Sequence, residues 1–298
     1  MALPIYATTG QKVWHYTYLT ICGLVLFFLV APLIIVIPLS FTSSPFLSFT
    51  PEMLSLDPAG FSLEWYKNMV GNCSDRVTTV CSTKWMIGFK NSIIIGIFAT
   101  LLATTLGTIA ALGLSRKHTP GRKALMALLI SPMIVPLIIT AASLALFSVT
   151  IFGVRFDLSA SHLGLVLAHT ILGLPFVVIT VTATLVGFDE SLTRASANMG
   201  AGPARTFFKV QMPLILPGVI SGALFAFITS FDEIVVVIFL GGADQLTLPR
   251  QMWAGIRQEI SPTILAAATI LVIISIVLLT TVELLRRRSE RMRGVSPA

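Results

Sequence analysis

Long apolar runs separated by polar stretches dominate the pattern of hydrophobic and polar positions along the chain. About 20 apolar residues in a helix cross the hydrocarbon core of a bilayer. A run exposed to lipid must be helical, because its backbone N–H and C=O groups have to be satisfied within the segment. The pattern predicts six transmembrane helices. They are Tyr16–Phe41, Asn91–Leu114, Ala124–Ile151, His162–Val186, Leu214–Leu240 and Pro262–Leu285.

The composition agrees with a polytopic membrane protein. Of the 298 residues, 55% are hydrophobic and 11% are charged, whereas about 25% are charged in a typical soluble domain. A soluble fold of this size could not hide so much apolar surface, because much of its area must face water. The expected fold class is therefore all-α, with residues 1–298 forming a single transmembrane domain. The first run is too long for a signal peptide, and no clear cleavage site follows it, so we expect it to be retained.

The positions of Lys and Arg predict the orientation. In a six-span arrangement, twelve basic residues lie in the segments after the second, fourth and sixth spans, and six lie in the opposite loops. Cytoplasmic loops collect Lys and Arg. Both termini are therefore expected in the cytoplasm, with residues 286–298 as a basic cytoplasmic tail. This placement explains the formal net charge of +7 without nucleic acid as a partner.

The long loop 42–87 is expected on the outer side. It contains Cys73 and Cys81, which have no His or further Cys near them to complete a metal site. On an oxidising side of the membrane, a disulfide is favoured over a metal pair. The loop is also rich in aromatic residues, and two interpretations stay open. It could be a small cap on the membrane surface or a docking surface for an outer partner.

The loop 187–213 is too apolar for a free loop and predicts a helix–turn–helix. Gly200 can end a first amphipathic helix in the left-handed conformation, and Pro203 suits the first turn of a second one. A segment of this kind is typical of a surface that docks into a groove of another protein. The apolar residues that recur at helical spacing before the turn are Leu185, Phe188, Leu192, Ala195 and Met199.

This loop resembles the "EAA" loop of ATP-binding-cassette importer permeases. That pattern is Glu-Ala-Ala, three residues, Gly, nine residues, and then Ile-x-Leu-Pro. The Ala, Gly and Pro positions match, a Val replaces the Ile conservatively, and an Arg reverses the charge of the Glu. The corresponding residues are Arg194, Ala195, Ser196, Gly200, Val210 and Pro213.

Further segments resemble the spermidine/putrescine-type subfamily of these permeases, and the resemblance extends from about Ser62 to Val272. They lie at the predicted second, fourth, fifth and sixth spans. The segments are Ser62–Tyr66 with Asn91–Ser92, Leu172–Phe176, Leu216–Gly218, Ser230–Glu233, Phe239–Gly242 and Ser261–Pro262.

The resemblance implies a permease without enzymatic activity, in a bacterial inner membrane. It would form half of the path for a polyamine or related amine or opine, beside a second permease subunit that is more often different than identical. A periplasmic binding protein would deliver the solute, and a dimer of ATPase subunits would dock on the loop 187–213. The chain has no Gly-x-x-x-x-Gly-Lys-Ser/Thr phosphate loop. ATP and Mg are thus expected on the ATPase, with no cofactor in this chain.

Polar residues inside the predicted spans are the candidates for the translocation path. Asp232 and Glu233 follow Ser230 in the fifth span, and His169 lies in the fourth. Charges inside a bilayer must face protein or water. The acids fit either attraction of a cationic solute or a structural pair at a subunit interface. His169 alone is more often a packing residue.

Two other classes compete with the importer. An ion-coupled secondary transporter could use Asp232 or Glu233 as its ion site, but the halves of the chain show no convincing repeat. An intramembrane enzyme would need a converging set such as His-Glu-x-x-His, which the four histidines do not form.

After the fifth span, Arg250, Trp253 and Arg257 share a face if this segment is helical. They fit either an interfacial anchor or a binding-protein contact.

Overall fold

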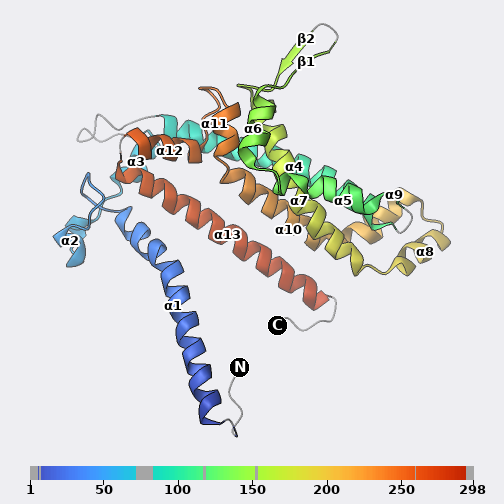
Figure 1. Ribbon diagram of the computed structural model, residues 1–298, viewed down its shortest axis with the longest axis horizontal. Coiled ribbons are helices and arrows are strands. Elements are labelled where there is room, and N and C mark those ends of the chain that lie inside the picture. The colour runs from blue at the N-terminus through green and yellow to red at the C-terminus, as the bar shows by residue number, and fades with distance from the viewer. Residues whose placement is uncertain are drawn as a thin grey trace. The chain divides into compact units, whose positions relative to one another are not determined.

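The computed structural model describes residue 6 and residues 8–71, 83–116, 119–151, 154–258 and 260–292 (Figure 1). Helices dominate this part of the chain. It comprises two compact units, Met1–Cys81 with Gln258–Leu271, and Ser82–Arg257 with Val272–Ala298. The elements are α1 Thr9–Leu39, α2 Pro51–Leu54, η1 Pro58–Gly60, α3 Glu64–Met69, α4 Lys84–Ser115, α5 Arg122–Ile130, η2 Ser131–Met133, α6 Leu137–Ala145, β1 Ser148–Ile151, β2 Val154–Asp157, α7 His162–Val186, α8 Glu190–Asn198, α9 Pro203–Thr206, η3 Phe207–Gln211, α10 Met212–Phe231, α11 Val235–Leu240, α12 Leu248–Gln258 and α13 Pro262–Met292.

The membrane-spanning elements confirm the helical architecture. Five helices are long and apolar enough to cross a bilayer, and a sixth span is possible as a bent pair. The five are Thr9–Leu39, Lys84–Ser115, His162–Val186, Pro203–Phe231 and Pro262–Leu284.

The third predicted span differs from the structure. The helices Arg122–Met133 and Leu137–Ala145 are bent by 89° relative to each other, so the prediction of a continuous helix over 124–151 was wrong. Pro132 and Pro136 explain the break, because proline lacks an N–H and its ring clashes with the preceding turn. The last residues of the predicted span form β1, which pairs antiparallel with β2 from Ser148 opposite Asp157 to Ile151 opposite Val154.

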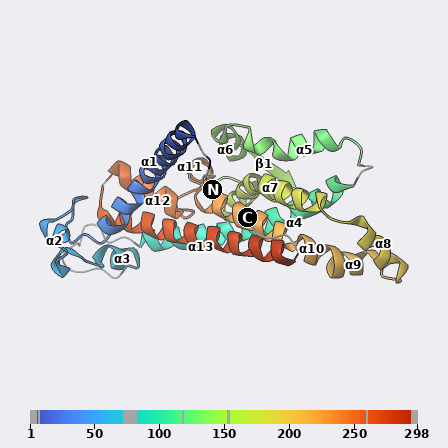
Figure 2. The same ribbon diagram turned by 90° about the horizontal axis from the view of Figure 1, so that it is seen from below.

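The core of the second unit is formed by α4, α7 and α10, which pack on one another, while α5 and α6 lie on one side of α7 (Figure 2). Small residues allow the close approach, as is common between helices in membranes. A Cβ atom on Gly218 would overlap Thr184, and one on Gly222 would overlap Thr180. On α4, a Cβ atom on Gly107 would lie 2.8 Å from Val177.

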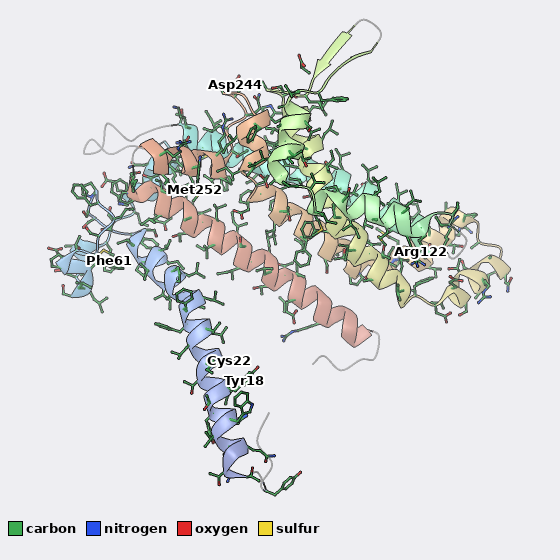
Figure 3. All side chains as sticks on the ribbon, viewed as in Figure 1. Tyr18, Cys22, Phe61, Arg122, Asp244 and Met252 are labelled. Carbon is green, nitrogen blue, oxygen red and sulfur yellow. The ribbon has the colours of Figure 1, made fainter. Side chains whose placement is uncertain are left out.

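The first unit contains α1 and the beginning of the predicted outer loop. The Trp65 indole N–H donates to the Thr42 carbonyl (2.7 Å), and the hydroxyls of Tyr66 and Ser40 lie 2.7 Å apart. The described part of the loop is therefore folded against the end of α1, which supports the interpretation as a cap. Cys73 and Cys81, the predicted disulfide pair, lie outside the described residues. Cys22 on α1 is a free cysteine (Figure 3).

Candidate functional site

The first helix of the loop 187–213 begins at a side-chain cap. Asp189 Oδ1 accepts the backbone N–H of Ser191 (2.8 Å), and Oδ2 accepts the Ser191 hydroxyl (2.7 Å). These hydrogen bonds, together with the positive charge of Arg194, lower the pKa of the Asp189 carboxyl. An ionised carboxylate is favourable here because the N-terminus of a helix carries partial positive charge. The cap fixes the start of α8, Glu190–Asn198.

The turn after α8 has the predicted geometry. Gly200 adopts φ +78°, and its amide N–H donates to the Ala197 carbonyl (2.9 Å). No atom lies within 4 Å of the position that a Cβ atom would occupy. Glycine is therefore required here by backbone conformation and not by space. Pro203 lies in the first turn of α9, so both predictions for this turn are confirmed.

A buried polar contact joins the two helices across the turn. The hydroxyl oxygens of Ser196 and Thr206 lie 3.0 Å apart, and the two residues are 4% and 5% exposed. Ser196 was a predicted site residue, but its partner was not predicted. Thr206 carries no sequence signal of its own, because only the fold of the turn brings it opposite Ser196.

The second helix continues into the membrane through a wide turn. Residues Phe207–Gln211 form a π-helix directly before α10. Pro213 has no N–H for the carbonyl four residues earlier, that of Lys209, and its ring crowds that carbonyl. The wider turn relieves this clash. Val210 is half-buried in this π-helix, and Pro213 is exposed at the start of α10.

The surface of the loop combines exposed apolar and charged side chains. Met199 and Phe208 are 82% and 67% exposed, and Arg194 and Ala195 are also exposed. A hollow of about 810 Å³ lies between this loop and the end of α4. Such a surface fits a protein partner better than a chemical reaction. The charged residues that line the hollow are Arg116, Glu190 and Arg194.

The two acids of the fifth span lie at a break and not in one continuous helix. α10 ends at Phe231 and α11 begins at Val235, so the prediction of a continuous helix over 214–240 was wrong. Glu233 Oε1 accepts the backbone N–H groups of Val235 (2.5 Å) and Val236 (3.1 Å). This carboxylate supplies the acceptor that the first N–H groups of a helix lack, which explains why a new helix begins after the break.

Asp232 differs from its neighbour. Its side chain is exposed, and the described residues provide no hydrogen bond or ion pair to its carboxylate. The two adjacent acids therefore have different surroundings. Glu233 is engaged by the backbone of α11, whereas Asp232 is available to a ligand or to another subunit.

The other two path candidates bond to each other. His169 Nδ1 on α7 lies 2.7 Å from the Ser230 hydroxyl on α10, and both residues are buried. This pair lies inside the packing of the two helices, which agrees with a packing role for His169. The second ring nitrogen, Nε2, is buried without a hydrogen-bond partner in the described part of the chain. Within the same part, no group of three or more His, Cys, Asp or Glu residues could hold a metal ion.

The sequence matches the family of binding-protein-dependent transport system inner membrane components over residues 103–292. The chain belongs to this family. It is a multi-pass inner-membrane permease subunit of an ATP-binding-cassette importer. The competing interpretation as an ion-coupled secondary transporter is therefore wrong, and the family is a transport component and not a class of enzymes.

Similar proteins of known identity support this assignment. The permease is 31% identical over 244 residues to the spermidine/putrescine transport system permease protein PotC of Haemophilus influenzae, covering 82% of this chain and 89% of that protein. It is 29% identical to the putrescine transport system permease protein PotI of Escherichia coli K12, covering 82% and 81%. A bacterial ABC transporter involved in the import of alginate matches with a TM-score of 0.63, covering 96% of this chain and 99% of that chain. At 14% identity, this last likeness concerns the fold.

Proposed function

We propose that this permease conducts a cationic amine of the polyamine class. The observation that carries the proposal is the free carboxylate of Asp232 at the break between α10 and α11. A charge inside an apolar span is costly unless it faces water or protein. A water-filled path would solvate Asp232, and its negative charge would attract an ammonium group. The printed names of the relatives, which are polyamine permeases, favour the same class of solute.

The loop 187–213 is the proposed contact with a separate ATPase, which would hold ATP and Mg as a dimer. Its exposed apolar side chains and the hollow beside α8 suit a helical element that docks into a groove. Arg194, Ala195 and Ser196 lie on α8, Gly200 forms the turn, and Val210 and Pro213 lead into α10. A movement of the docked loop would pass through the continuous segment Pro203–Phe231 toward the break at Asp232.

The proposed assembly has the loop 187–213 in the cytoplasm, together with both termini. The excess of Lys and Arg on that side supports this orientation. A periplasmic binding protein would deliver the solute from the other side, and a second permease subunit, different from this one, would complete the path. The exposed apolar side chains along α1 provide surface for lipid or for that subunit.

The test compares the two adjacent acids in the reconstituted importer. The measurements are uptake of labelled spermidine and putrescine into proteoliposomes, and ATP hydrolysis with the binding protein present. Asp232→Asn is expected to lower uptake by about tenfold or more, equivalent to about 1.4 kcal/mol, because the attraction for the cation is lost. Glu233→Gln is the matched control, since its amide oxygen can still accept the N–H groups of Val235 and Val236.

The outcomes separate the parts of the proposal. Uptake that falls equally in both variants would assign the acids a shared structural role. Unchanged uptake in Asp232→Asn would contradict the role of this acid in the path. Stimulation of ATP hydrolysis by neutral or anionic solutes alone would overturn the class of solute and leave the importer assignment intact.

A further inference from the structure

The segment between α11 and α12 is clamped to the beginning of α4. The Asn91 side-chain amide donates to the carbonyls of Asp244 (2.8 Å) and Leu246 (2.9 Å), and Asp244 marks this segment in Figure 3. The Ser92 hydroxyl oxygen accepts the backbone N–H of Leu248, the first residue of α12 (2.9 Å). These contacts place the start of α12 at the height of Asn91 along α4.

The height of Asn91 corresponds to a membrane boundary. The apolar run of α4 begins at this residue. α4 itself spans 32 residues, about 48 Å at 1.5 Å per residue, which exceeds a hydrocarbon core of about 30 Å. Part of α4 therefore projects beyond the core, and Lys84, Lys90 and Asn91 place the projecting turns at its beginning. α12 has 11 residues, about 16 Å, and is too short to cross the bilayer.

Arg250 does not share the exposed side of α12 with the other predicted surface residues. Its guanidinium donates to the carbonyls of Gly241 (3.0 Å) and Gly242 (2.7 Å) at the end of α11. This contact provides donors for carbonyls at a helix C-terminus, where a cation is favourable. Arg250 thereby ties α12 to α11, which is itself the helix that Glu233 caps.

A stripe of Trp253, Ile256 and Arg257 remains exposed on α12. The spacing of three and four residues places them on one side of the helix. Trp253 is 47% exposed and Ile256 is 51% exposed. The described residues of α12, Leu248–Gln258, contain no acid. The stripe therefore combines a large amphipathic ring, an aliphatic side chain and a cation.

We propose that this stripe binds the headgroup region of the outer leaflet and anchors α12 at the membrane surface. The indole ring would lie at the headgroup level, where Trp is enriched, and Ile256 would reach the edge of the acyl chains. Arg257 would hydrogen-bond to lipid phosphate. Continuity with the bilayer favours lipid as the occupant, because the next span begins at Pro262. The anchor would hold the outer end of α11 through Arg250.

The test measures the emission of Trp253 in nanodiscs that contain the complete importer. The difference between the wild type and Trp253→Phe isolates the emission of this residue from that of the other tryptophans. Phosphatidylcholines brominated near the headgroup end of the chains are expected to quench this difference more strongly than those brominated near the chain terminus. Addition of the binding protein should leave the quenching unchanged. If Trp253→Phe fails to assemble, Trp253→Tyr allows the same subtraction and keeps an amphipathic ring.

Three results would overturn the anchor. Quenching by acrylamide but not by brominated lipid would place Trp253 in water. Protection from acrylamide only when the binding protein is added would make the stripe a contact for that protein. Protection from both quenchers in the complex alone would place it against the second permease subunit.

Discussion

The loop 187–213 and the segment 241–258 are both turns that carry short helices, but they are held in different ways. In the first, the polar contact between the helices is the single pair of Ser196 and Thr206, and most of α8 is exposed. In the second, side chains from α4 and α12 hold five backbone groups. The loop 187–213 is held by a contact within the loop itself, whereas the segment 241–258 is also held by contacts to α4 in the helix bundle.

This difference agrees with different tasks. A coupling element has to move with a partner, and elements that move are drawn from parts of a fold with few buried contacts. The segment after α11 is instead held in place by Arg250 and by the contacts to α4, so we expect it to keep its position while the loop moves. We therefore expect changes in the loop 187–213 to uncouple ATP hydrolysis from uptake, and changes in the segment 241–258 to lower stability.

The largest effect is expected at Gly200. Gly200→Val forces a β-branched residue into the left-handed conformation, which costs about 1–2 kcal/mol or more and would reorient α8 relative to α9. Uptake should fall by about tenfold or more, equivalent to about 1.4 kcal/mol, while the subunit still inserts and assembles. The measurements are solute uptake and ATP hydrolysis by the same reconstituted complex.

Two variants control this prediction. Gly200→Asn should retain most uptake, because Asn tolerates the left-handed region. Gly202→Ala changes a neighbouring glycine with φ −68° and no atom within 4 Å of its Cβ position, so it should behave like the wild type. Equal losses of uptake in the Gly200 and Gly202 variants would mean that the left-handed conformation at Gly200 is not the cause of the loss.

The sequence predicts the local features of this turn well. Gly200 and Pro203 restrict the backbone only within a few positions of themselves. The structure confirms the left-handed turn at Gly200 and the start of a helix at Pro203. The spans also follow from local pattern, because a bilayer requires long apolar helices. The prediction fails where two determinants compete. Pro132 and Pro136 break the third span although its residues are apolar, and the acids at 232 and 233 interrupt the fifth.

The tertiary partners could not be predicted from a single sequence. Ser196 and Thr206 are 10 residues apart, and Asn91 and Asp244 are 153 residues apart. Ser, Thr and Asn side chains can hydrogen-bond to many different groups, so their presence does not identify a partner. The separate roles of Asp232 and Glu233 likewise depend on where the helix breaks.

An intermediate effect is expected at the clamp of the segment 241–258. Asn91→Ala would leave the carbonyls of Asp244 and Leu246 without their donor, at a cost of about 1–3 kcal/mol. The unfolding midpoint of the solubilised complex should fall, while the ratio of uptake to ATP hydrolysis in intact complexes stays near that of the wild type. Ser92→Ala removes one contact instead of two and should have a smaller effect. A changed ratio at unchanged stability would mean that the clamp takes part in coupling, and the contrast between the turns would fail.

The smallest effect is expected at Ser196, and it is the most direct test of how the first turn is held. Ser196→Ala removes one hydrogen bond worth about 0.5–1.5 kcal/mol and leaves the Thr206 hydroxyl buried without its partner. Uptake should fall only a few-fold, and the unfolding midpoint should scarcely change, because the bundle does not depend on this contact. Ser196→Ala combined with Thr206→Val removes both polar groups and should restore part of the loss. If the double variant is as impaired as the sum of the two single variants, the hydroxyls act independently of each other. The link across the turn would then lie in the backbone geometry of Gly200 alone.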